Sequence, residues 1–317
     1  MTETTQTVFE KHEIRKSRKQ KTAFIEYVQS TAASLGYESH TEKGYLGARN
    51  IVVGNPDTAK VVYTAHYDTC AGMPFPNFIT PKCIWLFLLY QILIGIVLVM
   101  IPSLLMAGLT RVLSAYGIKA HYMLLYYLWL LMILGMCWLI MAGPANKHTA
   151  NDNTSGVTTL LDIMTALPEE LRGNVAFVFF DLEEMGLFGS AGFANQHKNL
   201  TKNTLLINFD CVSDGKNILF VLRKDATRYA EAIKTAFPST ETLAVEVASK
   251  GVIYPSDQAN FTCGVGVAAL KKTKGGLLYM DRIHTRRDTV YMEENIAYLT
   301  EGAVRLAGSL TEQNTAG

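Results

Sequence analysis

The chain has 317 residues and a formal net charge of +1, with 29 Lys and Arg against 28 Asp and Glu. This balance excludes a strongly basic or acidic protein, so no nucleic-acid partner is expected. The charges are distributed unevenly, because residues 83–146 contain only Arg111 and Lys119. The remainder has the charge content of an ordinary soluble domain. The composition therefore predicts a soluble domain with an apolar insert.

The N-terminal part predicts a helix followed by two strands. Lys11 to Lys21 is a basic segment, which we interpret as a solvated helix face. Apolar residues then recur at helical spacing up to Gly36. Residues 50–54 and 60–65 are β-branched runs separated by Asn55-Pro56-Asp57, which is typical of strand–turn–strand structure. The apolar positions of the helix are Phe24, Val28, Ala32 and Leu35.

The apolar insert, residues 83–143, predicts a transmembrane helical hairpin. Residues 83–110 and 122–146 contain no charged side chain, and each run is long enough for a bilayer-spanning helix. We expect spans at about 84–108 and 122–143. Two alternatives are a buried helical hairpin within a soluble protein and a surface for a homo-oligomer.

The hairpin returns the chain to the side that it left, so residues 1–82 and 144–317 are expected to form a single split domain. The first 23 residues lack the apolar core of a signal peptide. The five cysteines, odd in number and without CxxC spacing, are typical of reduced thiols. We therefore expect an integral membrane protein with two spans, in the plasma membrane of a prokaryote, with its split domain in the cytoplasm.

After the insert, helices alternate with strands that are apolar throughout. Continuous apolar runs predict strands buried on both faces. This alternation predicts an α/β fold with a mostly parallel, mixed sheet sandwiched by helices. The expected helices are 155–166, 189–196, 225–237 and 293–310, and the expected strands are 175–180, 205–209, 243–247, 265–270 and 277–280.

Several of these elements end or begin at a residue that can bind a metal. In an open α/β sheet, ligands gather at the carboxyl ends of the strands. Two histidines with three carboxylates suit a pair of divalent cations, and the absence of thiolates from the set favours zinc, with manganese or cobalt as alternatives. The residues concerned are His66, Asp152, Asp210, His284 and one of Glu183 and Glu184, whose neighbour could accept a proton.

Together these segments resemble the M28 family of zinc metallopeptidases. The matching stretches occur in the family's order: Ala65–Asp68, Asn151–Gly156, Glu183–Ser190, Asn208–Asp210 and Ile283–Thr289. The resemblance implies a zinc-exopeptidase-like fold, two zinc ions and a peptide substrate. It places His66 and Asp210 on one ion, Glu184 and His284 on the other, and Asp152 between them. It makes Glu183 the general base and makes Asp68 the carboxylate that orients His66.

Other residues have weaker assignments. Tyr254, Asp257 and Asp288 are expected to line the substrate pocket, although a structural role is an alternative for Tyr254 and Asp288. Gln258 stands where the family commonly has His, which puts substrate contacts in doubt. Asp181 is expected either to tune Glu183 or to cap the next turn. Cys70 is interpreted as a small packing residue.

The insert separates His66 from Asp152, which lie close in sequence in most of the family. The hairpin therefore replaces a loop on the catalytic rim, and it is an anchor, a gate or a route by which substrates enter from the bilayer. We expect a membrane-anchored dinuclear zinc aminopeptidase. The alternatives are a glutaminyl-cyclase-like enzyme or other amide hydrolase, and a non-catalytic membrane receptor or assembly protein. A transporter is disfavoured because the spans carry no intramembrane charge.

Overall fold

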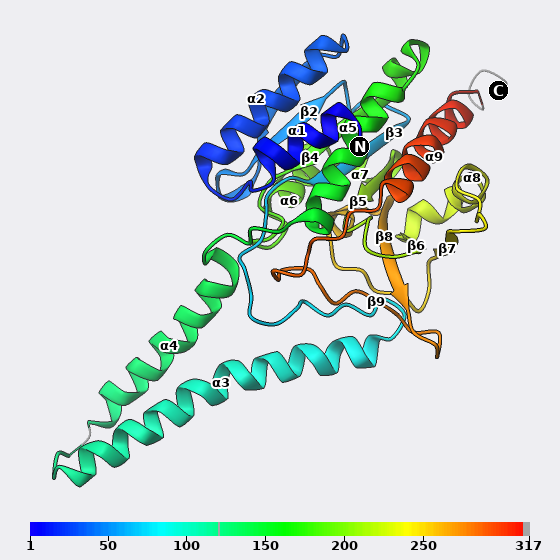
Figure 1. The fold of residues 1–317 in the computed structure, drawn as a ribbon. Helices are drawn as coiled ribbons and strands as arrows, with labels where there is room; N and C mark the ends of the chain where they lie inside the picture. Colours follow the sequence, from blue (N-terminus) through cyan, green and yellow to red (C-terminus); the bar gives the residue numbers. More distant parts are fainter. Residues whose placement is uncertain (120, 313–317) are drawn as a thin grey trace.

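The computed structural model describes residues 1–119 and 121–312. Its centre is a mixed sheet in the order β1-β2-β4-β3-β5-β8-β6-β7, with β9 paired to β8 (Figure 1). The four central strands, β4, β3, β5 and β8, run parallel to one another. The strands are β1 (Ser39–Lys43), β2 (Arg49–Val53), β3 (Val61–His66), β4 (Val175–Phe180), β5 (Leu205–Phe209), β6 (Asn217–Leu222), β7 (Ala244–Ala248), β8 (Gly264–Lys272) and β9 (Leu278–Tyr279).

Helices cover both faces of the sheet, which explains why its central strands are apolar throughout. In β4, Phe177 and Phe179 face one core cluster, and Val178 and Phe180 face the other. The first face is packed by α1 (Glu3–His12), α2 (Arg18–Ser34), α5 (Gly156–Ala166), α8 (Ala230–Ala236) and α9 (Glu293–Glu312), and the second by α6 (Phe188–Gln196) and α7 (Lys198–Asn203). The expected α/β sandwich is confirmed.

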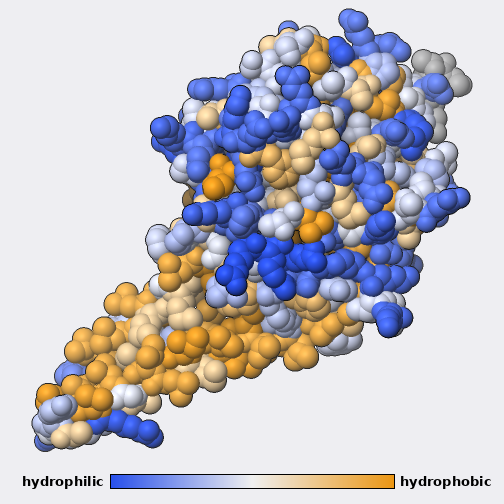
Figure 2. All heavy atoms as spheres, in the orientation of Figure 1, coloured by the Kyte–Doolittle hydropathy of each residue, from blue (hydrophilic) through white to orange (hydrophobic). Residues whose placement is uncertain are grey.

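Two long helices, α3 (Ile84–Ala115) and α4 (Tyr122–Ala142), project from this body as an antiparallel pair (Figure 1). Their surface is the largest continuous apolar area in the space-filling view (Figure 2). Trp85 is 80% exposed and Leu131 is 63% exposed, so the pair is not the buried hairpin of a soluble domain. By length and composition, both helices could cross a membrane. The first continues beyond the expected residue 108 and includes Arg111.

The root of this hairpin is fastened to the body. The linker before α3 and the linker after α4 meet in a bridge between Ala71 and Ala145. A second bridge joins Ile79 to Met280, next to the chain segment that carries His284. The hairpin therefore leaves and rejoins the sheet through ordered main-chain contacts.

The N-terminal segment differs from its expectation. Arg15 is fully buried and Lys21 is 7% exposed, so the basic segment is a solvated face only in part, at Lys11, Arg18 and Lys19. The helix α1 was not predicted, and neither were the strands β1 and β6. Strand β1 is mostly polar because it is an edge strand with exposed side chains. The expected helix at 225–237 is a 3₁₀ turn, Lys224–Tyr229, followed by the short α8.

Candidate metal centre

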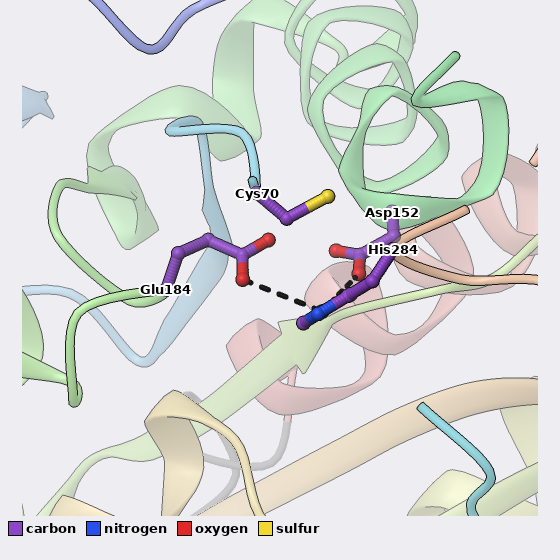
Figure 3. Close-up of side chains that lie close together, drawn as sticks. All are labelled: Cys70, Asp152, Glu184 and His284. Atoms are coloured by element: carbon purple, nitrogen blue, oxygen red, sulfur yellow. Dashed lines mark ion pairs between the residues drawn. The ribbon is translucent and has the colours of Figure 1, made fainter. Parts of the chain in front are cut away.

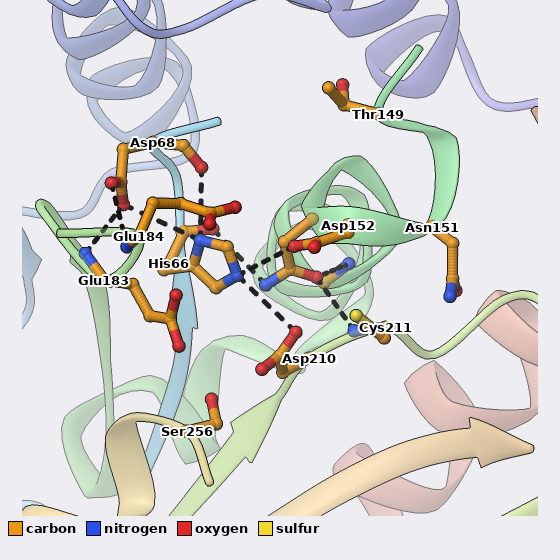
Figure 4. A network of polar contacts seen from close by, with 12 residues as sticks. His66, Asp68, Thr149, Asn151, Asp152, Glu183, Glu184, Asp210, Cys211 and Ser256 are labelled. Carbon is orange, nitrogen blue, oxygen red and sulfur yellow. Dashed lines mark hydrogen bonds and ion pairs between the residues drawn. The ribbon is translucent and has the colours of Figure 1, made fainter. Parts of the chain in front are cut away.

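The expected ligands meet because the central strands are parallel. His66 is the last residue of β3, and Asp210 follows β5 directly. Glu183 and Glu184 follow the end of β4 by a short turn. Since β3 pairs in parallel with both β4 and β5, all of these carboxyl ends lie at one edge of the sheet. Figure 4 shows these side chains converging.

His66 is 1% exposed and surrounded by carboxylates. Its Nδ1 lies 3.1 Å from the main-chain oxygen of Asp68, which orients the ring. Its Nε2 lies 3.3 Å from Asp152 Oδ1 and 3.5 Å from Asp210 Oδ1. Burial lowers the pKa of His66, but the carboxylates, with Glu183 foremost, outweigh it and raise that pKa well above the ordinary value.

A second cluster is built around His284. The Nε2 atom of His284 lies 3.0 Å from Asp152 Oδ2 and 3.3 Å from Glu184 Oε2. Despite burial, Glu184 and Asp152 raise the pKa of His284 to about 9. Both clusters are thus arranged to hold positive charge.

Asp152 belongs to both clusters, because one of its oxygens faces His66 and the other faces His284. It lies in an irregular turn, Ala150–Ser155, whose backbone is not helical at Asp152 and Asn153 and which leads into α5. The carboxylate of Asp288 accepts the main-chain N–H groups of Asn151 at 2.8 Å and of Asp152 at 3.0 Å. Asp288 therefore positions the shared carboxylate.

Asp68 has a wider role than the expected orientation of His66. Its Oδ1 lies 3.6 Å from His66 Nδ1. Its two oxygens also accept the main-chain N–H groups of Glu183 at 3.1 Å and of Glu184 at 3.3 Å. One buried carboxylate therefore aligns a histidine from β3 with both glutamates after β4 (Figure 4).

The glutamates lie in an environment that disfavours their charge. Burial is the largest cause, and nearby carboxylates add to it. Together they raise the pKa of Glu183 well above its ordinary value and that of Glu184 to about 8. A cation beside them would offset this penalty and favour their ionised forms.

The donor set fits divalent cations. Among the described residues, Glu184 Oε1 and Asp210 Oδ1 are buried without a hydrogen-bond partner. Ionised carboxylates only accept, so several of them can share a buried space when a cation lies between them. Ligand-capable atoms of His66, Glu183 and Asp210 lie within 4.8 Å of one another, and so do those of Asp152, Glu184, His284 and Cys70.

A cavity of about 320 Å³ opens onto both clusters. Its polar wall includes His66, Glu183 and His284. Its apolar wall comes from four separate parts of the chain, including the hairpin root and α4. The apolar lining residues are Ile79, Met141, Leu187 and Ile283.

Of the residues expected to contact substrate, Tyr254 lines this cavity, and its hydroxyl donates to the main-chain oxygen of Asp210 at 2.9 Å. Asp288 and Asp257 are buried and are not among the lining residues. Burial raises the pKa of Asp257 to about 7. Gln258 is also buried, and its side-chain amide donates to the main-chain oxygen of Tyr254 at 2.7 Å, so it supports the loop behind the cavity.

Asp181 points away from the site. It pairs with Lys21 and accepts the main-chain N–H groups of Arg49 at 3.0 Å and of Leu182 at 2.9 Å. Asp181 therefore holds α2 and β2 against the end of β4. It also caps the turn that follows β4.

Two supporting residues were not found from the sequence. Arg15 donates to the main-chain oxygen of Tyr67 at 2.5 Å and to Thr154 Oγ1 at 3.3 Å, behind the site. Asn153 donates to the main-chain oxygen of Phe209 at 3.0 Å and accepts from Cys211 N at 3.2 Å. Asn153 lay within the matched motif, but nothing in the basic N-terminal segment distinguished Arg15.

Comparisons with known proteins identify the family and the fold. A model of peptidase family M28 matches residues 134–303. Among solved structures, the chain is similar to the LapA aminopeptidase of Legionella pneumophila, with 13% identity, a TM-score of 0.55 and coverage of 96% of this chain and 69% of that one. It is equally similar to the glutaminyl cyclase of Porphyromonas gingivalis, with 16% identity, a TM-score of 0.55 and coverage of 96% and 94%. A leucine aminopeptidase precursor from Bacteroides thetaiotaomicron matches at 14% identity, a TM-score of 0.55 and 96% coverage of each chain. At these identities, the similarity shows the fold.

Proposed function

The chain belongs to peptidase family M28, and on that basis we propose that it is a membrane-anchored dinuclear metal exopeptidase, acting as an aminopeptidase on peptides. The observation that carries the proposal is the position of Asp152. Its Oδ1 faces His66 and its Oδ2 faces His284, so one carboxylate is shared by two ligand clusters. A shared carboxylate is what two neighbouring cations require.

The first cluster would hold one cation through His66, Asp210 and Asp152, and the second would hold the other through His284, Glu184 and Asp152. Nitrogen and carboxylate ligands favour zinc, with manganese or cobalt as alternatives. Two such ions would polarise the scissile carbonyl and make a water molecule between them more acidic.

The protein's own groups would do the remaining work. Glu183 lies in the cavity wall beside His66 and accepts the proton of the attacking water. It then returns that proton to the leaving amine. Asp68 keeps Glu183 and His66 in register, because it contacts both. A non-catalytic receptor or assembly protein would need neither the base nor its positioning, which favours an enzyme.

The apolar part of the cavity supports a preference for substrates with an apolar terminal side chain. Ile79 and Ile283 offer aliphatic surface, and Met141 offers an adaptable thioether. A cavity of about 320 Å³ suits one residue and its flanking peptide group better than a long folded segment.

The α3–α4 hairpin is proposed to span the membrane twice. Both linkers return to the same edge of the sheet, so the whole body lies on one side, with the cavity at the membrane surface. The five cysteines are free, which is consistent with a reducing cytoplasm. We assign the apolar surface of the hairpin to lipid, and cross-linking in native membranes would reveal a homo-oligomer formed through it.

The proposal is tested by incubating the detergent-solubilised protein with peptides of defined termini, with and without a chelator. Metal-dependent release of one N-terminal residue supports an aminopeptidase. Internal cleavage would overturn the exopeptidase assignment.

A glutaminyl cyclase is the second candidate, because such enzymes share this fold at the same TM-score. A peptide beginning with glutamine separates the two. A cyclase would release ammonia and leave the chain length unchanged, whereas an aminopeptidase would release free glutamine.

A further inference from the structure

Cys70 lies in the second ligand cluster. It follows β3 at the start of the linker to the hairpin, and it is 1% exposed. Its sulfur, one oxygen each from Asp152 and Glu184, and a ring nitrogen of His284 all lie within 4.8 Å of one another. Figure 3 shows Cys70 between Glu184 and Asp152, with its sulfur on the side of Asp152. Simple packing does not require a thiol beside two buried acids.

A second, independent observation points to a ligand in the same space. Glu184 Oε2 pairs with His284 at 3.3 Å, but Glu184 Oε1 is buried without a hydrogen-bond partner among the described residues. The side chain of Glu184 is only 6% exposed, so bulk water does not satisfy this oxygen. A cation between Glu184 and Cys70 would satisfy it.

The main chain holds the sulfur in place. The carbonyl of Cys70 accepts the N–H of Asn146 at 3.1 Å, and Ala71 bridges to Ala145. Three residues after Cys70, Met73 N–H donates to the carbonyl of His284 at 2.8 Å. The thiol and the imidazole are therefore fixed relative to each other, as preorganised ligands need to be.

We propose that the Cys70 thiolate is a ligand of the cation held by Asp152, Glu184 and His284. This rests on the proposed function only in taking that cluster to bind a metal. Asp152, Glu184, His284 and the thiolate would be four protein donors, and the water between the two ions would take a fifth position, as zinc allows during catalysis. On binding, the sulfur–hydrogen bond breaks, a metal–sulfur bond forms, and the proton leaves to solvent.

The thiolate makes the two clusters unequal. Cys211 lies within 4.8 Å of ligand atoms of Asp152 and Asp210 but forms no such group with His66. We therefore assign only nitrogen and oxygen donors to the cluster around His66 and Asp210, and these accept manganese and cobalt as well as zinc. The cluster with Cys70 is softer and selects zinc over manganese. It also exposes the enzyme to oxidants, because an oxidised sulfur is lost as a ligand.

Cobalt substitution of the full-length protein in detergent tests the proposal. Metal is removed with a chelator, Co²⁺ is added, and the near-ultraviolet spectrum is recorded with the bound cobalt counted. A sulfur-to-cobalt charge-transfer band is expected in the wild type. Cys70→Ser should lose this band while still binding cobalt at the other cluster.

Two matched cysteines serve as controls. Cys211 is buried beside Asp152 and Asp210, and Cys263 is buried away from the site against Arg228. Cys211→Ser and Cys263→Ser should both keep the band. Two results with the wild type would overturn the proposal, namely no cobalt uptake or bound cobalt without the band. A band that survives in Cys70→Ser, or one that is lost in Cys211→Ser, would also overturn it.

If Cys70→Ser does not fold, a measurement on the wild-type protein alone tests the proposal. X-ray absorption at the zinc edge should then show a sulfur neighbour at about 2.3 Å, the ordinary Zn–S distance. Zinc without sulfur overturns the assignment. Peptide hydrolysis without a sulfur signal would refute only the assignment of Cys70 as a metal ligand. A sulfur signal without hydrolysis would refute only the proposed reaction.

Discussion

The main-chain N–H of Met73 donates a 2.8 Å hydrogen bond to the main-chain carbonyl of His284, so the linker that enters the hairpin is joined directly to a candidate metal ligand. Met141, at the other end of the hairpin, lines the cavity next to the same histidine. The hairpin therefore contributes to the site as well as to the surface of the protein.

Met141→Ala should change substrate preference. Shortening this side chain enlarges the apolar part of the cavity. The kcat/KM for peptides with a medium aliphatic terminal residue should therefore fall about tenfold. The kcat/KM for peptides with a larger terminal residue should rise relative to that value. Leu131→Ala is the matched control, because Leu131 lies on the same helix and is 63% exposed. Equal changes for all substrates would contradict a role for Met141 in specificity.

Glu183→Gln should lower kcat by about 10²–10⁴-fold, because the amide cannot accept a proton from water. The bound metal should be unchanged, as measured by elemental analysis. Loss of metal in this variant would instead show that Glu183 is a metal ligand. This alternative arises because Glu183 lies close to His66 and Asp210.

Asp68→Asn should weaken activity and metal affinity together. The amide can accept only one of the two main-chain N–H groups that the carboxylate now accepts from Glu183 and Glu184. Residues that orient ligands commonly contribute about 10–100-fold. Metal affinity is measured by competition with a coloured chelator. An unchanged affinity together with a normal kcat would show that Asp68 does not position the ligands.

Lys21→Met should destabilise the fold. It leaves Asp181 as a buried, unpaired charge, which costs about 3–5 kcal/mol. Lys19→Met, at an exposed position of the same helix, is the control and should leave the melting temperature unchanged. Similar melting temperatures for both variants would show that the buried pair is unimportant.

The contribution of His197 to stability should depend on pH. Its ring contacts Glu42 Oε2 at 3.0 Å and Asp57 Oδ1 at 2.8 Å, and hydrogen bonding to Glu42 is the main cause that raises its pKa to about 9. A raised pKa means that the folded state holds the proton more tightly than the unfolded state. The stabilisation is therefore complete below about pH 6.5 and is lost as the pH rises through about 9.

We expect His197→Gln to lower the free energy of unfolding by on the order of 1 kcal/mol at pH 6, since the pair is partly screened by solvent. The difference from the wild type should vanish near pH 10. His148→Gln, at an exposed position, should show no such dependence. A wild-type advantage that stays constant across this range would contradict the assignment.

Local patterns in the sequence were sufficient for much of the fold and for several residues of the candidate site. The runs Val175–Phe180 and Leu205–Phe209 coincide with β4 and β5, because strands buried on both faces must be apolar at every position. His66, Asp210 and the glutamates were predictable because parallel strands bring their carboxyl ends to one edge. The apolar insert was equally plain, because its composition is unlike that of the rest of the chain.

Only the tertiary structure decided which side chains face one another. Arg15 and Lys21 belong to an ordinary basic segment, and they are buried because carboxylates and carbonyl groups from distant strands surround them. Cys70 was indistinguishable from a packing residue until Glu184 and His284, more than a hundred positions further along the chain, were found beside its sulfur. Such contacts depend on how the turns and linkers aim their side chains. That direction is set by long-range packing, which no local pattern records.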